Sequence, residues 1–187
     1  MKRVLVLYGT SEGHTATIAK AIADELWRVG VTADIVRAGT SDPRPAEYNG
    51  IIVAASVHAG AYQKEVRNWV RAHAPEFNGR RTAFVSVCLA ILQHDPKVLT
   101  EVDAIVRRFL DESGWRPSEI KLLAGALLYT KYNWFMRWMM KRITAKAGGD
   151  TDTSRDYDYT DWNDVRAFAG EFGRRLAAVS LVRSASR

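Results

Sequence analysis

The chain has 187 residues and a formal net charge of +6, and its 47% hydrophobic and 26% charged content is that of a soluble globular protein. The length suits one domain, no stretch approaches the roughly 20 apolar residues of a membrane span, and the N-terminus lacks a signal-peptide pattern. Its single cysteine, Cys88, excludes an internal disulfide and a cysteine metal site, so we expect a cytoplasmic protein without a metal centre.

The positive charge favours an anionic partner: a nucleic acid, an anionic membrane or an acidic small molecule. The alternative is that +6 serves only solubility. The distribution of basic residues along the chain is therefore more informative than the net charge.

Strands and helices alternate along the chain. An apolar run over 4–8 predicts a strand buried on both faces, and helical spacing over 14–29 predicts a helix that Gly30 ends. Further strands are predicted over 31–36, 51–55, 82–88 and 120–127, and further helices over 63–73, 96–110 and 161–178. The alternation predicts an α/β fold, a doubly wound five-stranded parallel sheet with helices on both faces.

One long segment interrupts this alternation. Residues 128–160 separate the fifth predicted strand from the last helix, where Asp161 is the expected N-cap. A connection of that length in a compact domain is usually functional. We therefore predict a single domain over 1–180 with an insertion over about 128–160, and a frayed polar tail over 181–187.

The loop between the first strand and the first helix, residues 9–15, has the chemistry of a phosphate site. Backbone N–H groups and the helix dipole at this point attract an anion. Thr10, Ser11 and Thr15 add hydroxyls, and Gly13 permits close approach of the backbone. The loop has no lysine and no G-x-G-x-x-G pattern, which argues against nucleotidase and dinucleotide sites and favours a terminal phosphate monoester. The alternative is a Ser/Thr turn that only caps the helix.

The spacing of this segment, from Val6 to Ala19, resembles the FMN-phosphate pattern of flavodoxins. The resemblance implies a flavodoxin-like fold that binds FMN. The residues that it implies around the phosphate are Thr10, Ser11, Glu12, Gly13, His14 and Thr15. Glu12 and His14 would contribute mainly backbone N–H groups. The side chain of His14 is expected to face solvent.

Two further loops should flank the flavin ring, at the ends of the third and fourth strands. Their candidate contacts are Ser56, Val57, His58, Ala59 and Gly60, followed by Val87, Cys88, Leu89 and Ala90. Tyr62 either stacks on the ring or packs onto the sheet. His58 either shuttles protons, contacts an acidic substrate or has no role. Cys88 is either a redox thiol or, as is commoner, a buried structural cysteine. No aromatic follows the fourth strand, so one ring face is covered by aliphatic groups or open to a substrate.

The insertion carries a basic, aromatic segment over 131–146. Five basic and no acidic residues are interleaved there with Trp134, Phe135, Trp138 and three methionines. Such an amphipathic helix suits a membrane interface, and it is too short and too charged to span a bilayer. The alternative is a helix that packs against the domain or a partner subunit.

Four motifs carry a more specific resemblance: SGWRP at 113–117, AGAL at 124–127, GGDTDT at 148–153 and YTDW at 159–162. With the phosphate loop, they closely resemble the menaquinone-dependent protoporphyrinogen IX dehydrogenases, flavodoxin-like haem-biosynthesis enzymes that use FMN, over roughly 1–177. The resemblance implies oxidation of protoporphyrinogen IX to protoporphyrin IX with electrons passed to a membrane quinone, either menaquinone or ubiquinone. We expect no nucleic acid partner. The basic and aromatic residues of 131–146 predict peripheral contact of this segment with the inner face of the cell membrane.

The chain departs from this family in the third-strand loop, where His58 and Ala59 replace an expected arginine and aromatic. A basic, apolar insertion nonetheless suits a large apolar macrocycle with two propionates. The charge and the motifs argue against two other functions. Flavodoxin electron carriers are usually acidic, so the net charge of +6 argues against that function. An NAD(P)H:quinone reductase needs a nicotinamide site, and no segment resembles one.

Overall fold

The computed structural model describes residues 1–131 and 152–185. A parallel sheet in the order β2-β1-β3-β4-β5 forms its centre. Its strands are β1 (Lys2–Gly9), β2 (Val31–Arg37), β3 (Gly50–Ser56), β4 (Arg81–Val87) and β5 (Glu119–Leu123). Val6 of β1 lies opposite Ile35 of β2 and Ile52 of β3, which places β1 inside the sheet. The predicted five-stranded doubly wound fold is confirmed.

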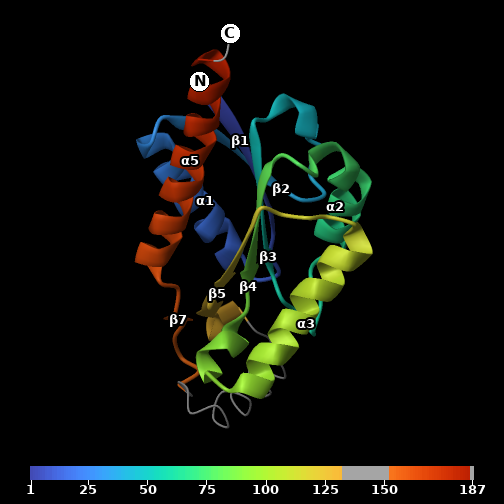
Figure 1. Cartoon of the computed structure of the whole chain (residues 1–187). Helices are drawn as coiled ribbons and strands as arrows, with labels where there is room; N and C mark the ends of the chain where they lie inside the picture. Colours follow the sequence, from blue (N-terminus) through green and yellow to red (C-terminus); the bar gives the residue numbers. More distant parts are fainter. Residues whose placement is uncertain (132–151, 186–187) are drawn as a thin grey trace.

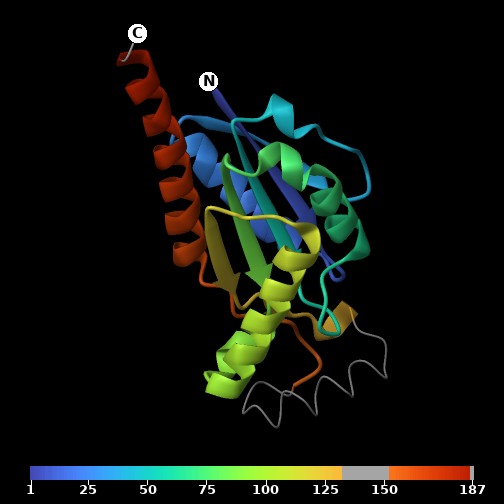
Figure 2. The same ribbon diagram turned by 45° about the vertical axis from the view of Figure 1, so that its right-hand side comes forward.

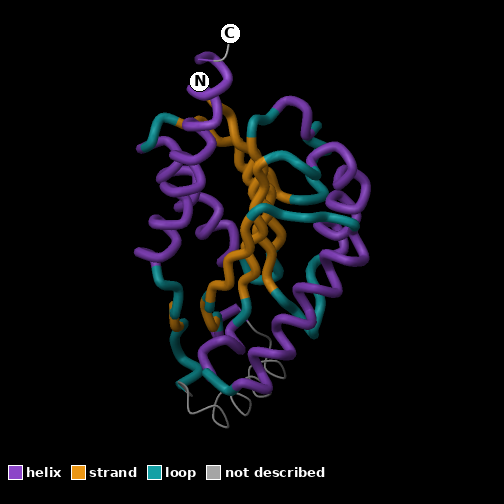
Figure 3. Tube along the Cα trace, viewed as in Figure 1, coloured by secondary structure: helices purple, strands orange, loops and turns teal. Residues whose placement is uncertain are grey.

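Two layers of helices enclose the sheet, α1 and α5 on one face and α2 and α3 on the other (Figures 1 and 3). The helices are α1 (His14–Arg28), α2 (Lys64–Phe77), α3 (Pro96–Ser113) and α5 (Trp162–Ala185). Short 3₁₀ turns are η1 (Pro45–Glu47), η2 (Leu89–Gln93) and η3 (Tyr129–Lys131). Asp161 caps α5 as predicted, because its Oδ1 accepts from the backbone N–H groups of Asn163 and Asp164 at 3.0 Å.

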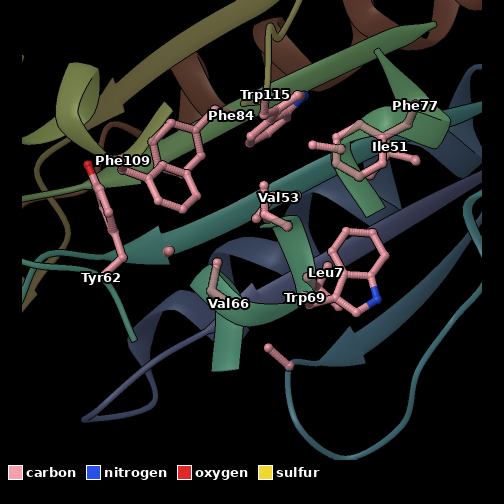
Figure 4. Packing of buried hydrophobic residues seen from close by; sticks show 14 of the residues in the cluster. Leu7, Ile51, Val53, Tyr62, Val66, Trp69, Phe77, Phe84, Phe109 and Trp115 are labelled. Atoms are coloured by element: carbon pink, nitrogen blue, oxygen red, sulfur yellow. The ribbon is translucent and has the colours of Figure 1, made fainter. Parts of the chain in front are cut away.

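Each face of the sheet has its own hydrophobic core. Aliphatic side chains dominate under α1 and α5, whereas aromatic rings interlock under α2 and α3 (Figure 4). Tyr62 is part of the aromatic core: it is 3% exposed, and its ring lies 5.1 Å from Phe84 and 5.0 Å from Phe109. Of the two fates predicted for Tyr62, the structure therefore selects packing onto the sheet.

The ends of the fifth strand and of the last helix differ from those predicted. The strand expected over 120–127 is two strands, because Gly125 turns the chain with a φ of +78° after β5. The second piece, β6 (Ala126–Leu127), pairs antiparallel with β7 (Tyr157–Asp158) and so joins the two ends of the insertion. Helix α5 continues to Ala185, well into the tail expected to fray. The basic helix predicted over 131–146 falls outside the described residues apart from Lys131, which ends η3.

Candidate functional site

The three predicted ligand loops meet at one edge of the sheet, where β1, β3 and β4 end. These strands are neighbours and parallel, so their carboxyl ends lie side by side. The backbone N–H of Val57 donates to the carbonyl of Val87 at 2.8 Å and joins the second loop to the third. Strand order reverses beside β1, and such a switch point is where ligands bind in open α/β sheets. Figure 2 shows the loops gathered at this end of the molecule.

The loop after β1 is closed by its own backbone and by a hydroxyl. Gly13, the N-cap of α1, has a φ of +99°, a conformation that glycine adopts without steric cost. Its N–H donates to Thr10 Oγ1 at 2.8 Å, and its carbonyl accepts from Ala16 N at 3.1 Å. The positive end of the α1 dipole therefore faces a preformed turn with no lysine or arginine in it.

Thr15 supplies the observation that tests this loop as a phosphate site. Its side chain is only 1% exposed, and its Oγ1 has no hydrogen-bond partner among the described residues. A buried hydroxyl without a partner costs about 1–3 kcal/mol, so such groups are rare in folded proteins. A phosphate oxygen at the N-terminus of α1 would satisfy this hydroxyl without any countercharge. The loop therefore fits the terminal phosphate of FMN.

Gln63 links the first loop to the second. Its amide Nε2 donates to Ser56 Oγ at 3.0 Å and to Ser11 Oγ at 3.3 Å. Above this link, His58 Nδ1 lies 3.8 Å from Glu12 Oε1. The structure thus brings together residues that lie more than forty positions apart in the sequence. Apart from Gln63, these residues come from the two segments that the sequence singled out.

The loop after β3 is a tight turn. The N–H of His58 donates to the carbonyl of Ala61 at 2.8 Å, and the N–H of Ala61 returns to the carbonyl of His58 at 3.1 Å. Ala59 and Gly60 both have positive φ, of +47° and +74°, which is uncommon for an alanine. Arg108 of α3 donates to the carbonyl of Gly60 at 2.5 Å.

The loop after β4 is aliphatic and closely packed at its start. The N–H of Cys88 donates to the carbonyl of Leu123 at 2.8 Å, and η2 follows directly. A Cβ on Gly125 would lie 2.5 Å from Val87 Cγ1, so only glycine fits beside this strand end. Burial raises the pKa of the Cys88 thiol, although a backbone hydrogen bond with Ala90 partly offsets the shift. A raised pKa disfavours the thiolate, which supports the structural interpretation of Cys88 over the redox one.

His14 connects the phosphate loop to the end of the insertion, contrary to the solvent-facing position expected for it. Its Nε2 is hydrogen-bonded to Thr160 Oγ1 at 2.7 Å and lies 3.4 Å from Asp158 Oδ1. Asp158 in turn accepts from the Thr160 N–H at 2.9 Å and from Trp162 Nε1 at 3.0 Å. The His14 and Trp162 rings meet edge to face at 5.8 Å. We call these four residues the His14 network.

A cleft of about 310 Å³ lies on the other side of the phosphate loop, toward β2. It lies between the ends of β1 and β2 and the start of α2, and its lining includes Thr10, Arg37, Gly39, Gln63 and Glu65. The cleft does not include residues of the loop after β4. It therefore does not coincide with the ring site that the sequence predicts.

Gln63, Arg108, Asp158 and Thr160 are parts of the site that the sequence does not reveal. Each contacts a residue that is distant in the chain: Gln63 contacts Ser11, Arg108 contacts Gly60, and Asp158 and Thr160 contact His14. One usable signal was present: Thr160 and Trp162 belong to the YTDW motif, which carries part of the family resemblance.

Comparisons with known proteins decide the family. A flavodoxin-domain family model matches residues 5–154. Protoporphyrinogen IX dehydrogenase (quinone) of Escherichia coli strain K12 is 35% identical over 170 residues, which cover 90% of this chain and 93% of that protein. A protein of the same name from Leishmania major is 36% identical over 180 residues, covering 95% of this chain and 77% of that protein. The chain belongs to this family.

Solved structures support the fold of this family member. An archaeal flavodoxin superposes with a TM-score of 0.55 at 13% identity and covers 94% of this chain and 99% of its own. Oxidised flavodoxin 1 of Bacillus cereus gives 0.52 at 17% identity, with 93% and 98% covered. The family and the fold expected from the sequence are thus confirmed, whereas the assignment of single FMN contacts stays a prediction.

Proposed function

We propose that the protein is an FMN-dependent enzyme of haem biosynthesis that oxidises protoporphyrinogen IX to protoporphyrin IX and passes the electrons to a membrane quinone. The observation that carries the proposal is the 35% identity, over 90% of the chain, to the Escherichia coli relative of that name. The buried, unpartnered hydroxyl of Thr15 supports the cofactor half of the proposal.

The chain would hold FMN with three loops. Residues 10–15 would bind the phosphate, and residues 56–60 and 87–90 would border the ring. When bound, FMN supplies a two-electron acceptor. The turn at 58–61 offers backbone groups held in place by two hydrogen bonds, and the aliphatic loop after β4 offers no aromatic to cover the ring. A large, apolar macrocycle would find an uncovered face there.

The stoichiometry of the reaction requires several turnovers of the cofactor for each substrate molecule. Conversion of protoporphyrinogen IX to protoporphyrin IX removes six electrons and six protons, so it requires three two-electron rounds. The electrons leave on the quinone after each round, and the protons leave to water or to the quinone. A site at the open end of the sheet, rather than inside the core, suits repeated exchange of reduced and oxidised partners.

A quinone acceptor calls for contact with a membrane. No helix in the described part of the chain is long and apolar enough to cross one. We propose peripheral attachment through 131–146, where five basic residues alternate with tryptophan, phenylalanine and methionine. Each basic residue near an anionic surface contributes about 1 kcal/mol, which salt screens.

Thr15→Val tests the cofactor half. Valine has the shape of threonine without its hydroxyl, so we expect FMN to bind roughly 10- to 100-fold more weakly because one phosphate oxygen loses its donor. The apoprotein should be equally or more stable, since no buried hydroxyl remains unpaired. Fluorescence titration with FMN and urea unfolding of the apoprotein measure the two effects. Thr100→Val, at an exposed hydroxyl of α3, is the matched control.

Unchanged FMN affinity in Thr15→Val would show that this hydroxyl does not meet the phosphate. Chromatography of the flavin released on denaturation provides a separate check. FAD in place of FMN would refute the cofactor assignment.

Porphyrin fluorescence in anaerobic assays tests the reaction. We expect oxidation of protoporphyrinogen IX with a menaquinone or ubiquinone analogue and none with NADP⁺ alone. An FMN-loaded protein that oxidises no protoporphyrinogen with any quinone would instead be an electron carrier.

Co-sedimentation with anionic vesicles tests the membrane half. The test variant replaces the five basic residues of the segment with glutamine: Lys131, Arg137, Lys141, Arg142 and Lys146. The control variant removes the same charge elsewhere, at Lys20, Arg28, Arg44, Arg107 and Arg116. We expect only the first variant to stay in the supernatant at low salt. Equal sedimentation of the two variants would mean that the segment does not bind the membrane.

A further inference from the structure

Arg108 is an exposed arginine of α3 whose guanidinium reaches the turn after β3. Its Nη2 donates to the carbonyl of Gly60 at 2.5 Å, and the guanidinium forms no ion pair with any described residue. The neighbouring Arg107 behaves differently, because its Nε binds Asp103 Oδ2 at 2.6 Å. Of these two adjacent arginines, only Arg108 therefore carries a charge that the described chain leaves uncompensated.

The turn itself does not require this arginine. Residues 58–61 are closed by two backbone hydrogen bonds, at 2.8 and 3.1 Å, between His58 and Ala61. The bond from Arg108 uses one of the five N–H donors of the guanidinium and holds the group beside the turn. Four donors in a planar fork remain, in the arrangement that matches a carboxylate.

At this turn the charge of Arg108 favours a negatively charged ligand, and the nearest described carboxylate to His58, that of Glu12, lies 3.8 Å from its Nδ1. The side chain of His58 is 52% exposed in the same turn. The turn follows β3 at the ligand edge of the sheet, and α3 extends past that edge beside it (Figure 2). An anion that reaches beyond the cofactor site at this point meets Arg108.

We propose that Arg108 binds a propionate carboxylate of the tetrapyrrole and thereby determines specificity for acidic porphyrinogens. This inference rests on the proposed function for the identity of the substrate. The macrocycle would lie over the open face of the site, and one propionate would extend to α3. The guanidinium pairs with it through charge-assisted hydrogen bonds, which are stronger than neutral ones.

Equilibrium binding of protoporphyrin IX to the FMN-loaded protein tests the proposal without turnover. Protoporphyrin IX keeps both propionates and is followed by its own fluorescence, and its dimethyl ester is the same macrocycle without the charges. We expect wild-type protein to bind the diacid more tightly than the ester. Arg108→Gln should weaken binding of the diacid by about 10- to 100-fold and leave ester binding unchanged.

Two further variants sharpen the result. Arg107→Gln removes an equal charge from the next residue and should change neither affinity. Arg108→Lys keeps the charge without the planar fork, so we expect an intermediate loss for the diacid. FMN content, read from the flavin absorbance, should be the same in all four proteins.

Two results would overturn the role of Arg108. An equal loss of diacid and ester binding in Arg108→Gln would mean that the arginine only positions the turn. Unchanged diacid binding would mean that no propionate reaches it. Failure of the proposed function looks different: wild-type protein would bind the diacid through Arg108 and yet oxidise no protoporphyrinogen.

Discussion

On the α2/α3 face of the sheet the core contains a cluster of aromatic rings among aliphatic side chains, whereas on the α1/α5 face it is built mainly from aliphatic side chains. In the described part of the chain, the aromatic face also contains two buried hydrogen bonds between side chains. Tyr62 Oη is bonded to Ser86 Oγ at 2.7 Å, and Trp115 Nε1 donates to Thr82 Oγ1 at 3.1 Å. Burial raises the pKa of the Tyr62 phenol, so this hydroxyl stays neutral.

The difference between the two cores shows how the turn after β3 and the phosphate loop are each held in place. Edge-to-face rings and buried hydrogen bonds are directional, so the aromatic core can fix the turn that ends beside Tyr62. Aliphatic packing has no such direction. On that face the phosphate loop is instead held by a polar contact at the surface of the core, between His14 and Thr160. The two sides of the site should therefore respond differently to mutation.

The largest effect is expected at Trp115, which is fully buried against Phe77 and Phe84. Trp115→Ala should lower the free energy of unfolding by about 3–5 kcal/mol, because it leaves a cavity and an unpaired Thr82 hydroxyl. Trp115→Phe keeps part of the volume and should cost less. Urea denaturation measures both, and a loss below about 1 kcal/mol for Trp115→Ala would contradict the importance of the aromatic core.

The fold was predictable because its signals are local. A buried parallel strand appears as an apolar run, and amphipathic helices follow each one, as at 4–8 and 14–29. The break at Gly125 was not predictable from hydrophobicity, because Ala126 and Leu127 continue the apolar pattern of β5. The turn at Gly125 and the tertiary pairing of β6 with β7 separate the two strands.

The candidate site was predictable in outline for a similar reason. A loop between a strand and a helix must lie at the carboxyl edge of a parallel sheet, so residues 10–15, 56–60 and 87–90 had to meet. The contacts that connect those loops to other elements were not predictable. His14 with Thr160 and Arg108 with Gly60 are separated by 146 and 48 positions, and no local pattern encodes such pairs.

An intermediate effect is expected for the His14 network. His14→Ala should lower the free energy of unfolding by about 1–2 kcal/mol, because it removes a part-buried hydrogen bond and the edge contact with Trp162. Thr160→Val should also lower the free energy of unfolding, by part of the same amount. A double-mutant cycle isolates the pair, and we expect a coupling of about 0.5–1.5 kcal/mol. Strictly additive losses would mean that His14 and Thr160 do not hold the phosphate loop together.

The smallest effect concerns the pH dependence of stability. It arises at His73, whose imidazole lies between two carboxylates on the α2/α3 side, apart from the ligand loops; we call this arrangement the His73 clamp. His73 of α2 contacts Asp42 through Nε2 at 2.8 Å and Glu76 through Nδ1 at 3.0 Å. Burial lowers the pKa of His73, but the two carboxylates outweigh it, so the pKa is raised above the ordinary value of about 6.5. The clamp therefore favours the protonated imidazole.

The sign of the pH dependence follows from this raised pKa. Stabilisation by His73 is fully present below about pH 6.5, where the unfolded chain also binds the proton, and it is lost as pH rises through the higher folded value. Because Asp42 is 76% exposed, we expect His73 to contribute less than about 1 kcal/mol to the free energy of unfolding. Urea denaturation of wild-type protein and His73→Gln from about pH 5.5 to 8.5 measures it. The stability difference should shrink as pH rises, and a difference that grew with pH would show that the imidazole is neutral in the folded protein.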